Sequence, residues 1–358
     1  MPKLCLLANA ASPHTEKWAL ELARRGWSVE LISFLPAEIP GVKIHLVPKV
    51  IGRKIDFILR VRWVKEKVQE LQPDILHAHY ATSFGFLGAI CSVHPFIISA
   101  WGSDIFSFPK QSLFHRLLLK WILGKADYLC STSHIMAKEM DCYIKVSQKI
   151  EVIPFGVDID QFSPQENLGS TSSRKVIFGV AKYLQPVYGL DILFESFARL
   201  NKLRPGQALL KIAGDGPELF RLKSLAARLG IDQYVEWLGA MPNSKIAQFY
   251  RDLDVVVVPS RQESFGVTAV EGSACARPII ASRVGGLPEV VIDRETGIMV
   301  EKENVSELTQ AMKYFMDHPE ERVRMGQAGR EFVLRNYAWK ENVTQMENVY
   351  RRVLQRSK

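Results

Sequence analysis

The segment "VVVVPSRQESFGVTAVEGSACARPIIAS", residues 255–282, contains a complete strand–helix–strand unit. The four valines and the run "PIIAS" are short and apolar, with the β-branched residues that buried strands favour. Residues 264–276 between them have the length and composition of a helix. Short apolar strands joined by helices are the building units of parallel sheets covered on both faces. The segment therefore predicts an α/β fold.

The same alternation of strand-like and helix-like segments runs along almost the whole chain. It stops in a stretch rich in Pro, Gly, Ser, Asn and Asp, and it resumes at "KVIFGVAK". We therefore predict two doubly wound, Rossmann-like domains that face each other across a cleft. The predicted parts are an N-terminal domain (1–160), a linker (161–174), a C-terminal domain (175–336) and a C-terminal helix that packs back on the N-terminal domain (337–358).

The hydrophobic content, the cysteines and the net charge indicate which class of protein this is. Hydrophobic residues make up 47% of the 358 residues, enough for a core in each domain. The five cysteines are scattered without a C-x-x-C pair, which favours a reducing, cytoplasmic environment over a disulfide framework or a zinc site. The net charge of +8 divides evenly between residues 1–160 and the remainder, with no basic tail, so no nucleic-acid partner is predicted.

One local basic stretch, residues 49–67, has seven basic and two acidic residues with Ile, Phe and Trp between them. Basic amphipathic segments of this kind lie on anionic membrane surfaces, which predicts a peripheral association with the inner face of the cell membrane. The alternative is an ordinary solvated helix face whose long basic side chains cover apolar surface.

Two glutamates, Glu263 and Glu271, stand eight positions apart around the predicted start of the 264–276 helix. The first turn of a helix offers free N–H groups to a phosphate, and Gly266 permits close approach of a ligand to the backbone. Carboxylates on either side accept hydrogen bonds from sugar hydroxyls, so the pattern suits a nucleotide-sugar. The alternative is that Glu271 pairs with a surface arginine.

The stretch "ESFGVTAVEGSACARPIIASRVGGLPEVVIDRETGIMV" resembles the signature region of family-4 glycosyltransferases, which have the GT-B fold. It carries a Glu-x7-Glu motif, a following apolar strand and a G-G-x-P-E turn. The segments "IAGDGPE" and "KIEVIPFGVD" and the closing 26 residues from "GREFVL" to "RRVL" are also similar to that family.

The resemblance implies a hexosyltransferase-type enzyme of polysaccharide or glycolipid biosynthesis. It would move a sugar from a nucleotide-sugar to a saccharide or lipid-linked acceptor, with retention of configuration. No cofactor and no metal is expected. The catalytic residues carried over by position are His79, Lys182 and Glu263. The donor-binding residues carried over are Lys182, Leu238, Met241, Glu263, Phe265, Gly266, Val267, Thr268 and Glu271.

Acceptor-binding residues are expected in the N-terminal domain, at Ser12, His14, Trp101 and Asp104. Trp101 is equally compatible with stacking on a sugar and with core packing, and Asp104 is favoured as a cap of the following turn. We expect His77 to be a core residue on the face of its strand opposite to His79.

The chain also departs from the family pattern in three places. The loop after the first strand, "NAASPHTEK", has no glycine, and Val187 and Tyr188 stand where the family often has a second basic residue. Trp101 stands where many relatives have His. Arg261 or Arg283 is a candidate replacement for that basic residue. These departures motivate the alternative of a non-catalytic or weakly active scaffold subunit with a transferase fold. A nucleotide-sugar epimerase would need further acid and base carboxylates, and a nicotinamide-dependent oxidoreductase would need a G-x-G-x-x-G loop that the chain lacks.

Overall fold

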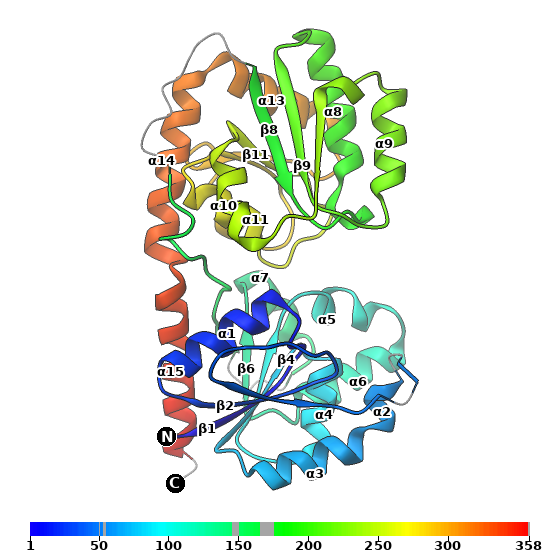
Figure 1. Ribbon diagram of the computed structural model, residues 1–358. Coiled ribbons are helices and arrows are strands. Elements are labelled where there is room, and N and C mark those ends of the chain that lie inside the picture. The colour runs from blue at the N-terminus through cyan, green and yellow to red at the C-terminus, as the bar shows by residue number, and fades with distance from the viewer. Residues whose placement is uncertain (50, 53–54, 145–149, 165–174, 357–358) are drawn as a thin grey trace. The chain divides into compact units, whose positions relative to one another are not determined.

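The computed structural model describes residues 1–49, 51–52, 55–144, 150–164 and 175–356. It forms two compact units, shown in Figure 1: Met1–Phe155 with Lys340–Lys358, and Gly156–Trp339. Of the predicted linker, residues 165–174 lie outside the described part. Residues 156–160 group with the second unit, not the first, because Val157 exchanges backbone hydrogen bonds with Tyr337 (2.8 Å) and Trp339 (2.9 Å). The helical residues from Lys340 onward group with the first unit.

The first unit is built on a seven-stranded sheet in which every pair of neighbouring strands is parallel. Its central strands are buried along their whole length, which explains their continuous apolar sequences. In spatial order the strands are β3 (Val42–Leu46), β2 (Ser28–Ser33), β1 (Lys3–Leu7), β4 (Ile75–His79), β5 (Phe96–Ala100), β6 (Tyr128–Ser131) and β7 (Ile150–Val152).

Helices lie between these strands in sequence, and the C-terminal helix α15 joins the same unit. They are α1 (Pro13–Arg24), α2 (Asp56–Leu59), α3 (Val61–Leu71), α4 (Ser83–Cys91), α5 (Ser103–Phe106), α6 (Leu113–Leu123), α7 (His134–Asp141) and α15 (Trp339–Arg356), with a 3-10 turn at Phe108–Lys110. The basic stretch 49–67, predicted as part of one helix that ends near Leu71, is divided between α2 and α3 at Arg60, and Arg53 and Lys54 lie outside the described residues.

The second unit contains a six-stranded parallel sheet. Its strands in spatial order are β10 (Val235–Gly239), β9 (Ala208–Ala213), β8 (Val176–Ala181), β11 (Val255–Val258), β12 (Ile279–Ser282) and β13 (Gly297–Val300). Its helices are α8 (Leu190–Leu203), α9 (Leu219–Arg228), α10 (Asn243–Arg251), α11 (Val267–Ala274), α12 (Leu287–Val290), α13 (Val305–Asp317) and α14 (Pro319–Asn336), with 3-10 turns at Pro186–Tyr188 and Asp232–Tyr234.

Both sheets share one strand order. In each, the first strand lies in the middle, the second and third extend to one side, and the fourth begins the other side. The direction of winding therefore reverses between β1 and β4 in the first unit and between β8 and β11 in the second. Loops that leave the carboxyl ends of two such strands diverge, and this opening is where doubly wound sheets bind ligands.

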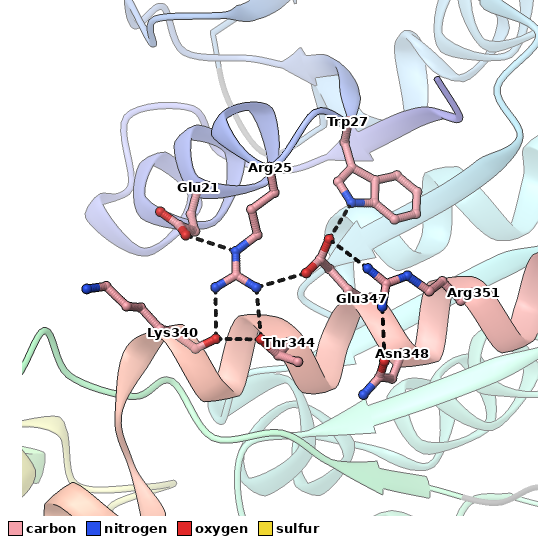
Figure 2. Close-up of polar contacts among 8 residues, drawn as sticks. All are labelled: Glu21, Arg25, Trp27, Lys340, Thr344, Glu347, Asn348 and Arg351. Carbon is pink, nitrogen blue, oxygen red and sulfur yellow. Dashed lines mark hydrogen bonds and ion pairs between the residues drawn. The ribbon is translucent and has the colours of Figure 1, made fainter.

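Helix α15 is fixed to the first unit by a buried carboxylate, that of Glu347, which is 6% exposed. One oxygen accepts a hydrogen bond from Trp27 Nε1 (2.9 Å), and the other accepts one from the Arg25 guanidinium (2.8 Å). Figure 2 shows that Arg25 is also held by Glu21 and by the Lys340 carbonyl. Burial raises the pKa of Glu347, but the hydrogen bonds from Trp27 and Arg25 outweigh it and lower the net pKa.

We expect Glu347→Gln to destabilise the docking of α15 by about 1–3 kcal/mol, because Arg25 loses its buried anionic partner. The measurement is amide hydrogen exchange in peptides from 340–356. The folded pKa lies below the unfolded value, so the stabilisation is present above the ordinary glutamate pKa of about 4.3 and is lost as pH falls through the folded pKa. Glu341→Gln, an exposed position on the same helix, is the control. Equal protection of wild type and Glu347→Gln at pH 7 would contradict the role.

Candidate active site

The switch point of the second sheet brings together two charged side chains that are 81 positions apart in sequence. Lys182 follows the last residue of β8, and Glu263 lies in the loop between β11 and α11. The Lys182 ammonium donates a hydrogen bond of 2.7 Å to Glu263 Oε2. The side chains are 12% and 10% exposed, so the ion pair is largely shielded from solvent.

The surroundings of Lys182 keep it protonated. Burial by itself lowers the pKa of Lys182, but the charge of Glu263 and the hydrogen bond to it outweigh burial, so the net pKa is raised. The ammonium also lies 4.6 Å from the centre of the Tyr188 ring, within cation–π distance. Lys182 is therefore a cation held in a fixed place at the carboxyl edge of the sheet.

Glu271 lies on α11, and its position is set by a tyrosine that the sequence did not single out. The Tyr250 hydroxyl donates a hydrogen bond of 3.0 Å to Glu271 Oε2. Tyr250 is fully buried, and burial together with the nearby Glu271 charge raises its pKa well above the ordinary value. The phenol thus stays neutral and acts as a hydrogen-bond donor. In sequence, Tyr250 is one apolar position of an amphipathic helix and carries no signal of this role.

The helix that carries Glu271 begins at Val267, slightly later than predicted, because Gly266 has a φ of +111°. Phe265 is 2% exposed and packs against the ring of Tyr337 at 5.4 Å. The Thr268 hydroxyl donates to the Ala181 carbonyl at 3.0 Å, which links the start of α11 to the end of β8. The predicted donor-binding residues Phe265, Gly266, Val267 and Thr268 therefore lie in one turn beside Lys182 and Glu263.

Glycines let a neighbouring backbone segment pack closely against each of the two loops that carry this pair. A Cβ on Gly285 would overlap the Glu263 carbonyl oxygen, and one on Gly286 would lie 2.6 Å from the Ser264 carbonyl oxygen. On the other side, a Cβ on Gly214 would overlap the Lys182 carbonyl, and one on Gly216 would lie 2.5 Å from the Leu184 carbonyl. The glycines of "IAGDGPE" and "VGGLPE" thus hold the loops of Lys182 and Glu263 in place.

The remaining predicted donor residues lie farther along the same sheet. Leu238 is in β10 and Met241 follows it, and both are partly buried. β10 is separated from β8 by β9, and the Gly214 amide donates to the Gly239 carbonyl at 2.7 Å. This hydrogen bond joins the start of the loop after β9 to the end of β10.

Arg261 and Arg283, the candidates to replace the missing second basic residue, are both paired with carboxylates, and the replacement stays a prediction. Arg261 donates to both oxygens of Asp191 (2.9 Å each), to Glu303 (2.6 Å) and to the Pro186 carbonyl. Arg283 donates to Asp293 and Glu301. Both guanidinium groups are committed to ion pairs, and Arg261 serves to hold the loop that presents Tyr188.

In the first unit, the predicted acceptor side contains a cluster of rings. His79, at the end of β4, is 3% exposed and lies 4.9 Å from the ring of Trp101, which also contacts Phe155 at 5.4 Å and His14 at 5.9 Å. Burial, and to a lesser degree His14, lower the pKa of His79 to about 3, so the imidazole is neutral. Its Nδ1 has no hydrogen-bond partner among the described residues.

His77 lies on the same face of β4 as His79, with ring centroids 4.7 Å apart, so the prediction of opposite faces is wrong. Residues two apart on a strand point to the same side. The expectation of a core position holds, because His77 is fully buried between the Tyr350 hydroxyl (2.7 Å) and the Ser99 hydroxyl (2.8 Å).

Asp104 and Ser12 differ in their burial and in their hydrogen bonds. Asp104 is fully buried, and its oxygens accept hydrogen bonds from the backbone N–H groups of Ala81 (2.7 Å) and Gly102 (2.7 Å). It therefore ties the loop after β4 to the loop after β5. Its role as a cap of the following turn stays a prediction. Ser12 is the residue before α1, partly buried, and its side chain makes no capping hydrogen bond.

The chain has two Asp-x-Asp sequences, at 158–160 and 252–254, and each contributes a carboxylate that accepts hydrogen bonds from backbone amides. Asp158 accepts hydrogen bonds from the amides of Asp160 (3.0 Å) and Gln161 (3.1 Å), and Asp254 accepts one from Ile177 (2.8 Å). Within the described residues, no three His, Cys, Asp or Glu side chains gather in a way that would hold a metal ion.

Comparison with known proteins agrees with this geometry. The profile of the family described as "Glycosyl transferases group 1" matches residues 164–332, and the profile described as "Glycosyl transferase 4-like" matches residues 3–133. The matched profiles define the class of protein as a glycosyltransferase, and the solved structures with the same architecture give its fold as GT-B. The chain belongs to the family of group 1, or family-4, glycosyltransferases.

Curated relatives cover much of the chain. A glycosyltransferase of Methanocaldococcus jannaschii, itself uncharacterized, is 29% identical over 89% of this chain and 87% of its own length. The D-inositol 3-phosphate glycosyltransferase of Corynebacterium glutamicum is 31% identical over 77% of this chain and 72% of its own length. Among further D-inositol 3-phosphate glycosyltransferases, several are matched over less than two thirds of their own length, from 48% to 60%.

Solved structures with the same fold cover nearly all of both chains. The sucrose-phosphate synthase of Thermosynechococcus elongatus superposes with a TM-score of 0.86 at 21% identity, over 99% of this chain and 100% of that one. The Anabaena protein HepE in complex with UDP and glucose superposes with a TM-score of 0.81 at 18% identity, over 98% and 99%. No helix among the described residues is both long and apolar enough to cross a membrane.

Gly285 offers a test of the backbone arrangement under Glu263. We expect Gly285→Ala to lower the melting temperature much more than Gly206→Ala. Both glycines have a positive φ (+51° and +67°), so both substitutions carry a conformational cost of about 1–3 kcal/mol. Only at Gly285 does the added methyl overlap another backbone segment, since nothing lies within 4 Å of a Cβ at Gly206. Equal melting temperatures for the two variants would show that the Glu263 loop is not held by this contact.

Proposed function

We propose that this protein transfers a sugar from a nucleoside-diphosphate sugar to a saccharide or lipid-linked acceptor, with retention of configuration and without a metal ion. The observation that carries the proposal is the buried Lys182–Glu263 pair at the switch point of the second sheet, beside a Glu271 carboxylate oriented by Tyr250. Support comes from the fold shared with a solved structure that contains UDP and glucose.

In this proposal the donor lies along the start of α11. The diphosphate takes the backbone N–H groups of that helix and the Lys182 ammonium, and Glu271 accepts hydrogen bonds from the ribose hydroxyls. Glu263 accepts hydrogen bonds from hydroxyls of the transferred sugar. Leu238 and Met241 lie where the base would rest against the main chain. The acceptor is held in the first unit near Ser12, His14 and Trp101, and the neutral His79 imidazole binds a sugar hydroxyl.

The reaction breaks the bond between the anomeric carbon and the phosphate oxygen, and it forms a bond from that carbon to the acceptor oxygen. The acceptor hydroxyl proton passes to the departing phosphate on the same face of the sugar, and nucleoside diphosphate leaves. Negative charge develops on the diphosphate as the bond breaks, and the fixed Lys182 cation stabilises that charge. This is the role for which a transferase would otherwise use a metal.

The donor site is tested by calorimetric titration with UDP, GDP and ADP in the absence of added metal. We expect one of the three to bind in the micromolar range and binding to be lost in Glu271→Ala. Tyr250→Phe should weaken binding roughly 2- to 10-fold, because Glu271 loses one hydrogen bond. The control is Tyr183→Phe, at a tyrosine that is 56% exposed. If none of the nucleotides binds, the transferase proposal fails and a non-catalytic scaffold takes its place.

Lys182 is tested by turnover of the donor identified in that titration, measured as its hydrolysis when no acceptor is added. We expect Lys182→Gln to lower kcat by roughly 100- to 1,000-fold with a smaller change in KM, because the cation acts on charge that develops in the transition state. Lys175→Gln, at an exposed lysine just before β8, should leave kcat unchanged. A wild-type kcat in Lys182→Gln would rule out the role assigned to this residue.

A further inference from the structure

Helix α6 exposes apolar side chains that a water-soluble helix would normally bury. Leu113, Phe114, Leu117 and Trp121 are 71%, 68%, 57% and 42% exposed. At 100° per residue these four positions fall within one arc of about 100°. The opposite face of the helix carries Leu119, Ile122 and Leu123, which are buried in the core of the first unit. The helix is therefore apolar on its solvent face as well as on its core face.

The charged residues of the α6 segment itself are all basic, and one of them, Lys110, pairs with Glu139 of α7 at 3.5 Å. Residues 110–125 contain four basic residues, Lys110, Arg116, Lys120 and Lys125, and no aspartate or glutamate. Arg116 and Lys120 are exposed and fall on one flank of the apolar arc. Lys125 lies 5.9 Å from the centre of the Trp121 ring. A basic flank beside exposed Leu, Phe and Trp side chains matches a surface that is apolar inside and anionic at its rim.

A second set of exposed apolar side chains adjoins the same supporting helix. Ile55, Ile58 and Leu59, in and beside α2, are 48%, 63% and 47% exposed. Both α2 and α6 pack against α4. The exposed face of α3, by contrast, carries an ion pair between Arg62 and Glu66. The part of the basic stretch 49–67 suited to apolar contact is thus its beginning, at α2.

We propose that the exposed face of α6, with Leu113, Phe114, Leu117 and Trp121, docks on an anionic lipid bilayer, and that α2 adds to the contact. This inference rests on the proposed function, and it names the form of the acceptor, a saccharide on a membrane lipid. The chain passes from the end of β5 through Trp101 and Asp104 to α6. Helix α5, which carries Asp104, packs against the 3-10 turn Phe108–Lys110, and that turn packs against α6. A bilayer bound at α6 would therefore bring a lipid-linked sugar to the side of the first unit that carries this predicted acceptor residue.

Vesicle binding tests this inference on the full-length protein. Sedimentation with vesicles of phosphatidylcholine alone and of phosphatidylcholine with phosphatidylglycerol is compared at low and high salt. We expect binding only to the anionic vesicles, and weaker binding at high salt. Phe114→Ser/Leu117→Gln should weaken the partition coefficient by roughly tenfold or more, and Arg116→Gln/Lys120→Gln should weaken it and reduce its salt dependence.

The control variant is Phe220→Ser, at a phenylalanine of the second unit that is 83% exposed, which should bind vesicles as the wild type does. Absence of wild-type binding, or equal binding by Phe114→Ser/Leu117→Gln, would overturn the inference. So would a monomer–dimer equilibrium that the same double variant abolishes, because the face would then bind a second copy. Nucleotide titration of the double variant distinguishes the two proposals, since vesicle binding needs no donor and donor binding needs no vesicle.

Discussion

The buried ion pair between Lys182 and Glu263 is the interaction on which the second unit's carboxyl edge depends. A lysine or a glutamate alone at about 10% exposure would be costly, and each makes burial of the other acceptable. The loops after β8 and β11 meet at main-chain distance, where the Arg261 N–H donates to the Val187 carbonyl (2.8 Å). Gly214 and Gly216 let the loop after β9 pack against the main chain of the Lys182 loop, and Gly285 and Gly286 let the loop after β12 pack against the main chain of the Glu263 loop. The glycine pattern thus helps to fix the two loops that carry the ion pair.

The two sheets have the same strand order but carry different side chains at their carboxyl edges. Both wind in the same order and both have an opening at the switch point. In the first unit the loops near that opening carry rings: His79 and Trp101 lie 4.9 Å apart, and His79 is neutral. In the second unit they carry a fixed cation and two carboxylates. A neutral aromatic edge suits an uncharged sugar, and the Lys182 ammonium suits a diphosphate.

Much of the fold was predictable from the sequence because strands and helices follow regular hydrophobic patterns. Short apolar strands separated by helices predicted both α/β units, and Lys182 and His79 lie at strand ends in the structure. The position of Glu271 was predicted as well, but its partner was not, because Tyr250 looks like any apolar position of a helix. The contacts of Arg261 with Asp191 and of Gly285 with Glu263 were also beyond reach, since they join residues that no period relates. The error at His77 was one of geometry, not of missing information.

Tyr188 stands where a second basic residue was expected, and its ring contacts Lys182. The centre of the Tyr188 ring lies 4.6 Å from the Lys182 ammonium, so the face of the ring attracts the cation without adding a charge. Lys182 then has two partners of different kinds, the ring of Tyr188 and the carboxylate of Glu263. In the proposed reaction a diphosphate competes with Glu263 for Lys182, while the ring keeps its contact. The same exchange frees Glu263 to accept hydrogen bonds from sugar hydroxyls, so binding of the diphosphate and binding of the sugar are coupled through one ammonium group.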